Sequence, residues 1–374
     1  MGYIGQAPTD VPLTGSDLAD GIINSAKIAD GTIASVDLAA GVGGTNYSGR
    51  NDIINGGLVV NQENVTAPAD ADFTIGDLFL HNGEGTPVMS LETDGPQGTR
   101  PWQKMVLDAN AQGGLAYIVP NDTVQDYIAD GKMSFGIQLK TTAATIANAR
   151  IGVIKWTGTA DAVTKELVGT WASDGTSPTL GTSLSYENTP ANLGLTTSWA
   201  RHVVEDVTVD SDTKNIILFV WTDDGTITAS DVIGFSEWQL NPGSTVNDFS
   251  SGDAESVRGQ INPYLHREDY DQVSSQVISM EGGCNATVNT LHYIRWEGEM
   301  RSIPVVTSTV VGTFAFSDYS TNGQPATSLG FSNVSRYGCQ MNCVHSGFVV
   351  GRAVKLTRDG TDTCWIQADS RIGV

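Results

Sequence analysis

The segment Lys132-Met-Ser-Phe-Gly-Ile-Gln-Leu-Lys140 alternates apolar side chains with polar or small ones. Met133, Phe135, Ile137 and Leu139 therefore share one face, which is the pattern of a β-strand buried on one side. Comparable runs of strand length recur along the chain, and Asp-Gly pairs and other turn signals separate them. These runs lie at 53–62, 149–156, 202–209, 215–221 and 232–240. Many short strands with little helix predict an all-β fold built around a jelly-roll or lectin-like β-sandwich.

Helical patterning is scarce in this chain. One short helix is expected at 124–129, after the polar run Asn121-Asp-Thr123 and before Asp130-Gly131. A polar stretch around 253–259 forms either a second short helix or a linker. Beyond it, strand-like runs return at 290–297, 305–316, 348–356 and 364–368. These last runs predict a second, smaller β domain at the C-terminal side.

The N-terminal region carries a different periodicity. An aliphatic side chain occupies every fifth position of 13–38, namely Leu13, Leu18, Ile23, Ile28, Ile33 and Leu38. A period of five is neither the 3.6 of a helix nor the 2 of a strand. It suits a chain that turns a corner once per repeat, and such repeats gain stability by stacking on neighbours. We therefore predict a stem in which three copies wind around a shared axis. The alternative is a flexible linker rich in Ala and Gly.

The chain has 374 residues, which is more than one hydrophobic core usually needs. A Gly-rich break at 41–44 follows the repeat, and the strand pattern begins shortly after it. We expect an attachment and oligomerising stem at 1–47 and a lectin-like sandwich at 48–250. A linker at 251–268 and a distal C-terminal β domain at 269–374 complete the predicted organisation.

Charge excludes one large class of function. The chain has 20 basic and 42 acidic residues, a formal net charge of −22, so the basic footprint of a nucleic-acid-binding protein is missing. The acidity suits solubility, a saline environment or calcium sites, and the sequence does not separate these. No run of 18 apolar residues exists, so no membrane insertion is expected. The first ten residues lack the basic and apolar parts of a signal peptide, so we expect synthesis in a cytoplasm without export by that route.

No catalytic or cofactor motif stands out. The chain has no nucleophile elbow, zinc-hydrolase motif, phosphate loop or dinucleotide loop. Cys339, Cys343 and His345 form a small cluster, but a structural zinc site needs a fourth ligand and usually tighter spacing. We expect buried free thiols, no metal and no cofactor. A pair of glycosidase carboxylates is defined by spatial separation, so polysaccharide depolymerase activity stays an alternative.

Several segments resemble parts of bacteriophage tail fibres and receptor-binding fibres of the marine or cyanobacterial phage type. The opening Gly2-Tyr-Ile-Gly-Gln-Ala-Pro8 is similar to the start of such fibres ahead of their repeat. Asn51-Asp-Ile-Ile-Asn-Gly-Gly-Leu-Val-Val-Asn-Gln62 resembles the first strand of their lectin-like sandwich, with Leu58 and Asn61 in place of a Phe and a Trp. Trp238-Gln-Leu-Asn-Pro-Gly-Ser-Thr-Val-Asn-Asp-Phe249 resembles the strand that closes it. Glu299-Met-Arg-Ser-Ile-Pro304 resembles the first strand of the terminal domain.

The resemblance implies a homotrimeric, non-enzymatic virion protein. Its N-terminus would attach to another tail or head protein, and its distal β domains would bind a host-surface polysaccharide. A purely structural virion protein, either a head fibre or a tail adaptor without a receptor, is the main alternative. Assembly would take place in the host cytoplasm before the protein becomes part of the virion.

Aromatic side chains are the candidates for sugar binding, because their rings can stack on the apolar faces of sugars. The tryptophans at 156, 199, 221 and 238 lie on or beside predicted strands of the sandwich, so we expect them mainly in its core. The distal domain offers Trp296 and Trp365, and its polar loops offer Tyr319 and Tyr337. Loops on a rigid scaffold commonly carry recognition, so these four residues are the predicted glycan-binding set.

Overall fold

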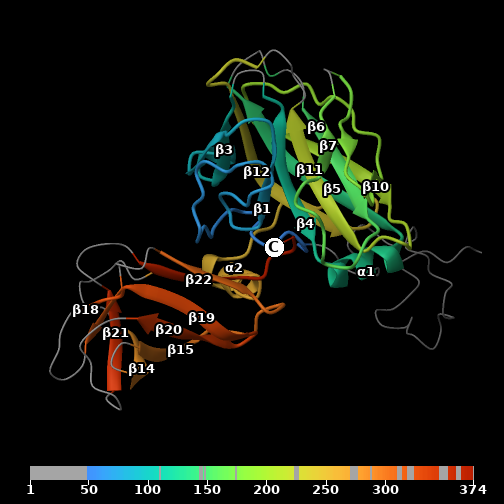
Figure 1. Ribbon diagram of the computed structural model, residues 1–374. Helices are drawn as coiled ribbons and strands as arrows, with labels where there is room; N and C mark the ends of the chain where they lie inside the picture. The colour runs from blue at the N-terminus through green and yellow to red at the C-terminus, as the bar shows by residue number, and fades with distance from the viewer. Residues whose placement is uncertain are drawn as a thin grey trace, which may run out of the picture. The chain divides into compact units, whose positions relative to one another are not determined.

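Two five-stranded antiparallel sheets pack face to face and form a β-sandwich (Figure 1). The computed structural model describes residues 49–108, 111–142, 146, 149–172, 175–222, 227–269, 277–286, 289–309, 314–317, 324–344, 353–358 and 364–373. One sheet has the order β1 (Phe79–Gly83), β4 (Gly113–Val119), β11 (Asn215–Thr222), β6 (Arg150–Trp156) and β9 (Leu184–Tyr186). The other has the order β10 (Ala200–Thr208), β5 (Lys132–Thr141), β12 (Val232–Pro242), β3 (Trp102–Val106) and β2 (Val88–Glu92). The predicted all-β sandwich is therefore confirmed.

Strand β5 and strand β11 show how apolar patterning builds these two layers. The inward side chains of β5 are the four predicted from its alternation, and all are fully buried in the core between the sheets. Strand β11 is buried along its whole length, because its two faces enter different cores. Ile216, Leu218 and Val220 face the other sheet, whereas Ile217, Phe219 and Trp221 pack against a layer of loops outside. A continuous apolar run is the expected pattern for a strand covered on both sides.

A β-bulge in β12 places the central tryptophan of the sandwich. The pairing of β12 with β5 shifts between Ser236 and Gln239, and Glu237 there adopts a positive φ of 51°. This extra residue reverses the alternation, so that Trp238 points inward after Phe235 does. The Trp238 ring packs 5.0 Å from that of Phe79, and its Nε1 donates to Gln103 Oε1 at 3.2 Å. Trp221 and Trp238 are both fully buried, as predicted for them.

The segment at 53–62, predicted as a strand, instead forms turns and irregular structure. Asn55 adopts a positive φ of 63°, and its side chain bonds both the N–H and the carbonyl of Val60. Asn51 Nδ2 donates to the Trp238 carbonyl at 2.8 Å. These side-chain bonds replace the regular ladder of a strand, so the prediction for 53–62 is wrong.

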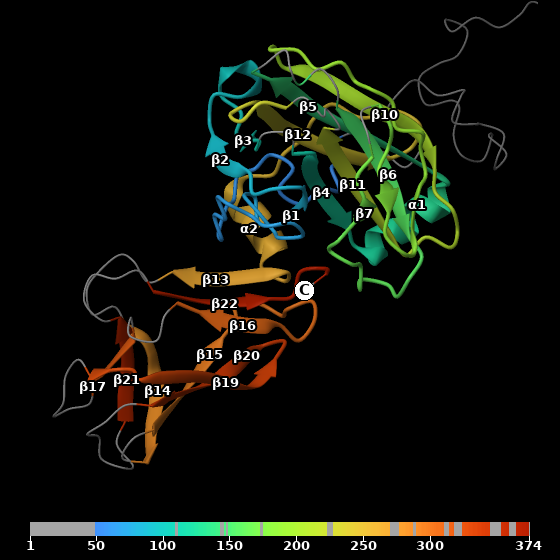
Figure 2. The same ribbon diagram turned by 45° about the horizontal axis from the view of Figure 1, so that its top comes forward.

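Two further sheets lie toward the C-terminal side (Figure 2). The larger has the order β18 (Gln324–Pro325), β17 (Phe314–Ser317), β21 (Ala353–Arg358), β14 (Val277–Ala286), β15 (Asn289–Arg295), β20 (Gly338–Val344) and β19 (Ser328–Ser335). The smaller joins β13 (Leu265–Asp269), β22 (Trp365–Asp369) and β16 (Val305–Ser308). Together they enclose a separate apolar core that contains Ile294, Trp296 and Met341.

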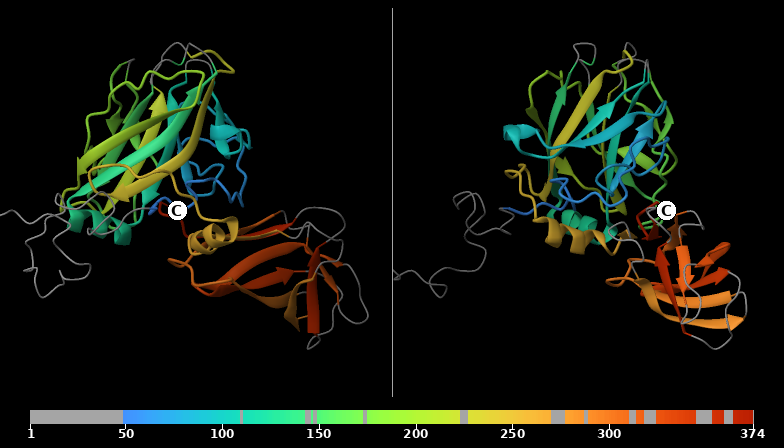
Figure 3. Two further views of the ribbon diagram at one scale, coloured as in Figure 1. Left: turned by 180° about the vertical axis from the view of Figure 1, so that it is seen from behind. Right: turned by 90° about the vertical axis from the view of Figure 1, so that its left-hand side faces the viewer.

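Several predicted elements outside the two main sheets can be compared with the structure. The short helices correspond to α1 (Asn121–Asp130) and α2 (Ala254–Ile261), which are drawn in green and in gold respectively in Figure 3. The single strand expected at 305–316 is two strands, β16 and β17, and 299–304 ahead of them is a series of bends. A short hairpin of β7 (Val168–Thr170) and β8 (Thr179–Leu180), and a 3-10 turn at η4 (Pro96–Gly98), complete the described elements. The predicted stem, including its six aliphatic residues, lies outside the described residues.

The stretch at 251–268, expected as a linker, contains α2 and most of β13. Asp253 caps α2 by accepting from the N–H groups of Glu255 and Ser256. Val257, Ile261 and Leu265 are buried in the sandwich core. This stretch is therefore packed structure that continues the sandwich into the smaller sheet.

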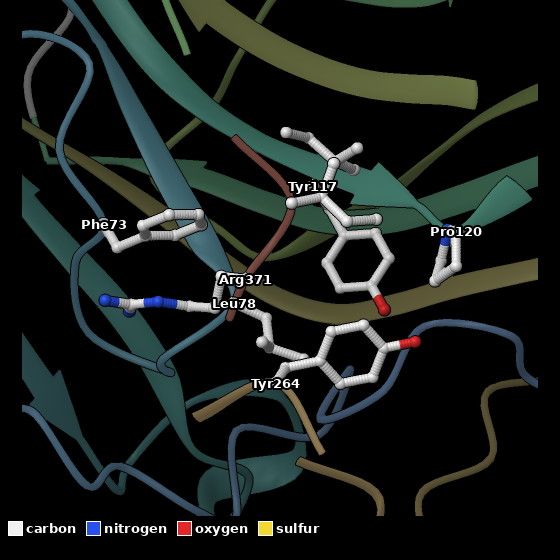
Figure 4. A pocket seen from close by; sticks show the side chains of 8 residues that line it. Phe73, Leu78, Tyr117, Pro120, Tyr264 and Arg371 are labelled. Carbon is white, nitrogen blue, oxygen red and sulfur yellow. The ribbon is translucent and has the colours of Figure 1, made fainter. Parts of the chain in front are cut away.

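A buried arginine holds the end of the described chain against the sandwich (Figure 4). Arg371 is 4% exposed and contacts Asp369 at 2.5 Å and Glu63 at 2.6 Å. Its Nη1 also donates to the Asp77 carbonyl at 2.7 Å, and its guanidinium lies 4.0 Å from the centre of the Phe73 ring. The neighbouring Ile372 joins the apolar cluster outside β11. The C-terminal segment is thus part of the packing of the sandwich.

None of the helices in the described ranges is long and apolar enough to span a membrane.

We predict that Arg371→Met destabilises the protein strongly, because it leaves the carboxylates of Asp369 and Glu63 without their buried cation. Breaking a buried pair from one side typically costs about 3–5 kcal/mol. Urea unfolding followed by tryptophan fluorescence measures the shift of the transition.

The matched control is Lys132→Met, which removes an exposed cation 3.2 Å from Asp206. Exposed pairs contribute less than about 1 kcal/mol, so this variant should unfold close to the wild type. Equal shifts of the unfolding transition in the two variants would show that the buried ion pairs of Arg371 do not stabilise the protein.

Candidate functional site

Strands β19, β20 and β15 present one face to solvent. Their other face packs against the apolar core that the two C-terminal sheets enclose, which we call the small core. In β15, Thr290, His292 and Ile294 point inward, whereas Tyr293 and Arg295 are exposed. Trp296, which directly follows the strand, is also buried. In β20, Cys339, Met341 and Cys343 point inward. The antiparallel register places Tyr293 opposite Gln340, and Gln340 opposite Ser332 of β19. The exposed face therefore carries one aromatic residue beside a row of polar side chains.

The side chains in this row are connected by hydrogen bonds. Gln340 Nε2 donates to the Tyr293 hydroxyl at 3.3 Å. Gln340 Oε1 accepts from Asn333 Nδ2 at 2.9 Å and from Ser332 Oγ at 3.4 Å. Asn333 has a positive φ of 50° beside the bulge in β19, and this directs its amide toward Gln340. The network holds the amides in one orientation while leaving them at the surface.

Tyr337 lies at the turn between β19 and β20, next to this row. It is 62% exposed, and Tyr293 is 58% exposed. A hydrogen bond from the Tyr337 hydroxyl to Glu299, together with the negative charge of that carboxylate, raises the pKa of Tyr337 above its ordinary value. Glu299 is itself paired with Arg336 at 2.8 Å. These contacts restrict the position of an otherwise exposed ring.

A glycine at the end of the turn is needed for the close approach of β20 to β15. A Cβ added to Gly338 would lie 2.2 Å from the carbonyl oxygen of Ile294. Any side chain at this position would push the strands apart. The position of Tyr337 beside Tyr293 therefore depends on the glycine that follows it.

The tyrosines and the polar row surround a shallow depression of about 340 Å³. We call this surface the amide–tyrosine face and define it by Tyr293, Asn333, Tyr337 and Gln340. The depression is also lined by Arg295 and Ser335. Amide groups can donate and accept hydrogen bonds at once, and a fixed ring offers an apolar plane. This combination suits a ligand that alternates hydroxyl groups with apolar faces.

Among the described candidates, Tyr337 is the one placed on this face. Trp296 is 6% exposed and belongs to the small core, where its Nε1 donates to the Ser335 carbonyl at 3.3 Å. A ring enclosed in this way offers no exposed face on which a sugar could stack. The prediction of Trp296 as a glycan-binding residue is therefore wrong, and it is a core residue. It shares the inward phase of Ile294, which the alternation of β15 requires.

The other two candidates have different outcomes. Trp365 is half-buried on β22, in a different sheet from Tyr337, and the guanidinium of Arg267 lies 4.6 Å from the centre of its ring. One plane of that indole is therefore occupied by a cation. Tyr319 lies outside the described residues.

A second aromatic cluster lies on the sandwich. Trp102 and Trp199 meet edge to face at 5.4 Å, and Lys140 Nζ lies 4.0 Å from the first ring and 4.7 Å from the second. Trp102 Nε1 donates to Asp94 at 2.8 Å, which lowers the pKa of that carboxyl. Lysine thus covers a plane of both indoles, and Trp102 is buried. Lys140 and Asp94 therefore already occupy the ring faces and the indole N–H that a ligand of this cluster would use.

The cysteines considered for a metal point into the small core. Burial raises the pKa of the Cys339 thiol to about 12 and raises that of Cys343 as well. Burial thereby favours the thiol over the thiolate that binds metals. His345, the third member of the predicted cluster, lies outside the described residues. Within the described ranges no group of three His, Cys, Asp or Glu residues is arranged to hold a metal ion.

Sequence reasoning missed Tyr293, Asn333 and Gln340. The alternation in 290–297 contains a usable signal, because Tyr293 falls in the opposite phase to Ile294 and Trp296. Asn333 and Gln340 have no comparable signal. Their meeting depends on the register of β19 with β20 and on the bulge beside Asn333.

No family model and no curated protein matches this chain. Solved structures share limited similarity with it. TmCBM61, solved with beta-1,4-galactotriose, is 11% identical, with 52% of this chain and 99% of that chain covered and a TM-score of 0.31. A family 11 carbohydrate-binding module from Clostridium thermocellum, solved with a beta-1,3-1,4-mixed-linked tetrasaccharide, is 10% identical, with coverage of 48% and 96% and a TM-score of 0.27.

A third similar structure is the glycoside hydrolase domain of Endo-D from Streptococcus pneumoniae R6. It is 7% identical, with 83% of this chain and 41% of that chain covered and a TM-score of 0.26. The three TM-scores and identities are too low to carry a ligand or an activity over to this chain.

Proposed function

We propose that this chain is a non-enzymatic bacteriophage fibre protein that binds a host-surface glycan through the amide–tyrosine face. The observation that carries glycan binding is the exposed row in which Gln340 connects Tyr293 to Asn333 beside Tyr337. An exposed aromatic side chain commonly lacks fixed neighbours. Here both tyrosines are held by hydrogen bonds to other side chains, so their side chains lose little further conformational entropy when a ligand binds.

The chemistry of the face matches that of a sugar ring. The tyrosine planes offer contact to the apolar face of the ring, and the amides of Gln340 and Asn333 offer donors and acceptors to its hydroxyl groups. By analogy with aromatic pairs, each stacking contact is worth roughly 1 kcal/mol. The depression is shallow and open, so a single site binds weakly.

Trimerisation would compensate for weak single sites. The pentad repeat at 13–38 supports a stem shared by three copies, and the resemblance of several segments to phage fibres supports attachment of the N-terminus to a tail or head protein. Three identical faces on one rigid assembly raise the avidity for a repetitive polysaccharide without any new contact. In this proposal the protein acts in the virion.

We expect Tyr293→Ala and Tyr337→Ala each to weaken binding to surface polysaccharide from the host bacterium about fivefold, since each removes one stacking plane. Isothermal titration with fragments of that polysaccharide measures the Kd of each full-length variant. Trp199→Ala is the control, because it removes an indole of the sandwich cluster and leaves the amide–tyrosine face intact.

Loss of binding in the Trp199 variant, with the tyrosine variants unchanged, would move the site to the sandwich and contradict the proposal. Binding by none of the proteins would favour a purely structural virion protein. Release of reducing ends from the polysaccharide would identify a depolymerase instead.

Assembly is tested by Ile28→Asp, which introduces the same charge into every copy of the predicted stem. Three carboxylates brought together near an axis are strongly unfavourable, so we expect loss of the trimer in light scattering. Lys27→Asp changes a neighbouring position that is predicted to point outward, and it should leave the trimer intact. Equal tolerance of both changes would support the flexible-linker alternative.

A further inference from the structure

Arg295 lies at one end of the amide–tyrosine face. It follows Tyr293 by two residues on β15, so both side chains emerge on the exposed side of the sheet. Its partner across the strands is Gly338, which has no side chain to cover it. Arg295 also lines the depression together with both tyrosines.

No carboxylate in the described residues pairs with Arg295, although acidic residues lie nearby. Glu297 is two positions farther along, and its Oε2 accepts from Asn262 at 3.2 Å. Glu299 is held by Arg336 at 2.8 Å and by Tyr337. The acidic neighbours thus have other partners.

Other arginines of the same region behave differently. Ion pairs connect Arg267 to Asp269, Arg301 to Asp161, Arg336 to Glu299 and Arg371 to Asp369. The whole chain contains 42 acidic residues against 20 basic ones, yet none of the described carboxylates forms an ion pair with Arg295. Its planar guanidinium is free to form two parallel hydrogen bonds to an anionic group.

We infer that the ligand of the amide–tyrosine face is a sugar that carries an anionic group, either a carboxylate or a sulfate, bound by Arg295. This inference rests on the proposed function and names its ligand class. The tyrosines and amides would hold the ring and its hydroxyl groups, while Arg295 selects the charged substituent. The net charge of −22 opposes an anionic polymer at long range, but charges beyond about 8 Å are largely screened at physiological ionic strength.

The test compares three probes on the full-length protein: polygalacturonate with carboxylates, dextran sulfate with sulfates, and neutral dextran. Affinity electrophoresis gives the apparent Kd for each. We expect the wild type to bind at least one anionic polymer more tightly than dextran.

Arg295→Gln should weaken that binding about tenfold, the effect of one charge-assisted hydrogen bond, and Arg295→Lys should weaken it less. Comparison of the two anionic arms separates carboxylate from sulfate recognition.

Arg258→Gln is the matched control, because it removes an exposed arginine of α2 that does not line the depression. An equal loss of affinity in this variant would show that the effect of Arg295→Gln comes from the change in net charge alone, and it would overturn the inference. So would a wild type with no preference for either anionic polymer over dextran. In both cases the binding of host polysaccharide by Tyr293→Ala and Tyr337→Ala still tests the proposed function, because the loss of a stacking plane does not depend on a charged substituent.

Discussion

The pairing of β15 with β20 is the constraint on which the small domain and its candidate site depend. This register places Ile294 opposite Cys339, both inside, and Tyr293 opposite Gln340, both outside. Since side chains alternate along a strand, a slip by one residue would expose Trp296 and bury Tyr293 with its polar neighbours. The buried indole therefore fixes the register that displays the tyrosine. Core packing and surface recognition are two consequences of the same strand pairing.

The sandwich supports this domain through contacts that are distant in sequence. Arg371 follows β22, yet it meets Glu63 and the Asp77 carbonyl of the sandwich and lies against Phe73. A buried ion pair of this kind is a weak source of net stability, but it is costly to break from one side. The chain therefore ends, as far as it is described, in a contact that penalises any displacement of β22 from the sandwich.

Much of the fold could be predicted from periodicity alone. The alternation of β5 and the apolar run of β11 are local signals, and both strands occur where the patterns place them. The segment at 53–62 misleads because its apolar residues suggest a strand, whereas Asn55 and the two glycines after it favour a turn, and Asn55 bonds the backbone of Val60 there. The bond from the Trp238 N–H to the Gly56 carbonyl is long-range and has no local signal. The site was harder to predict. Tyr337 could be chosen as an exposed loop aromatic, whereas Gln340 and Asn333 meet only through strand register and a bulge. Aromatic identity alone also selected Trp296, whose inward phase on β15 makes it a core residue.

A crystal structure of the full-length protein with a bound oligosaccharide from the host polysaccharide would locate the glycan-binding site. We expect a sugar ring stacked on Tyr293 or Tyr337, with its hydroxyl groups within hydrogen-bonding distance of the amides of Gln340 and Asn333. A sugar bound on the sandwich near Trp199, with the amide–tyrosine face empty, would contradict it.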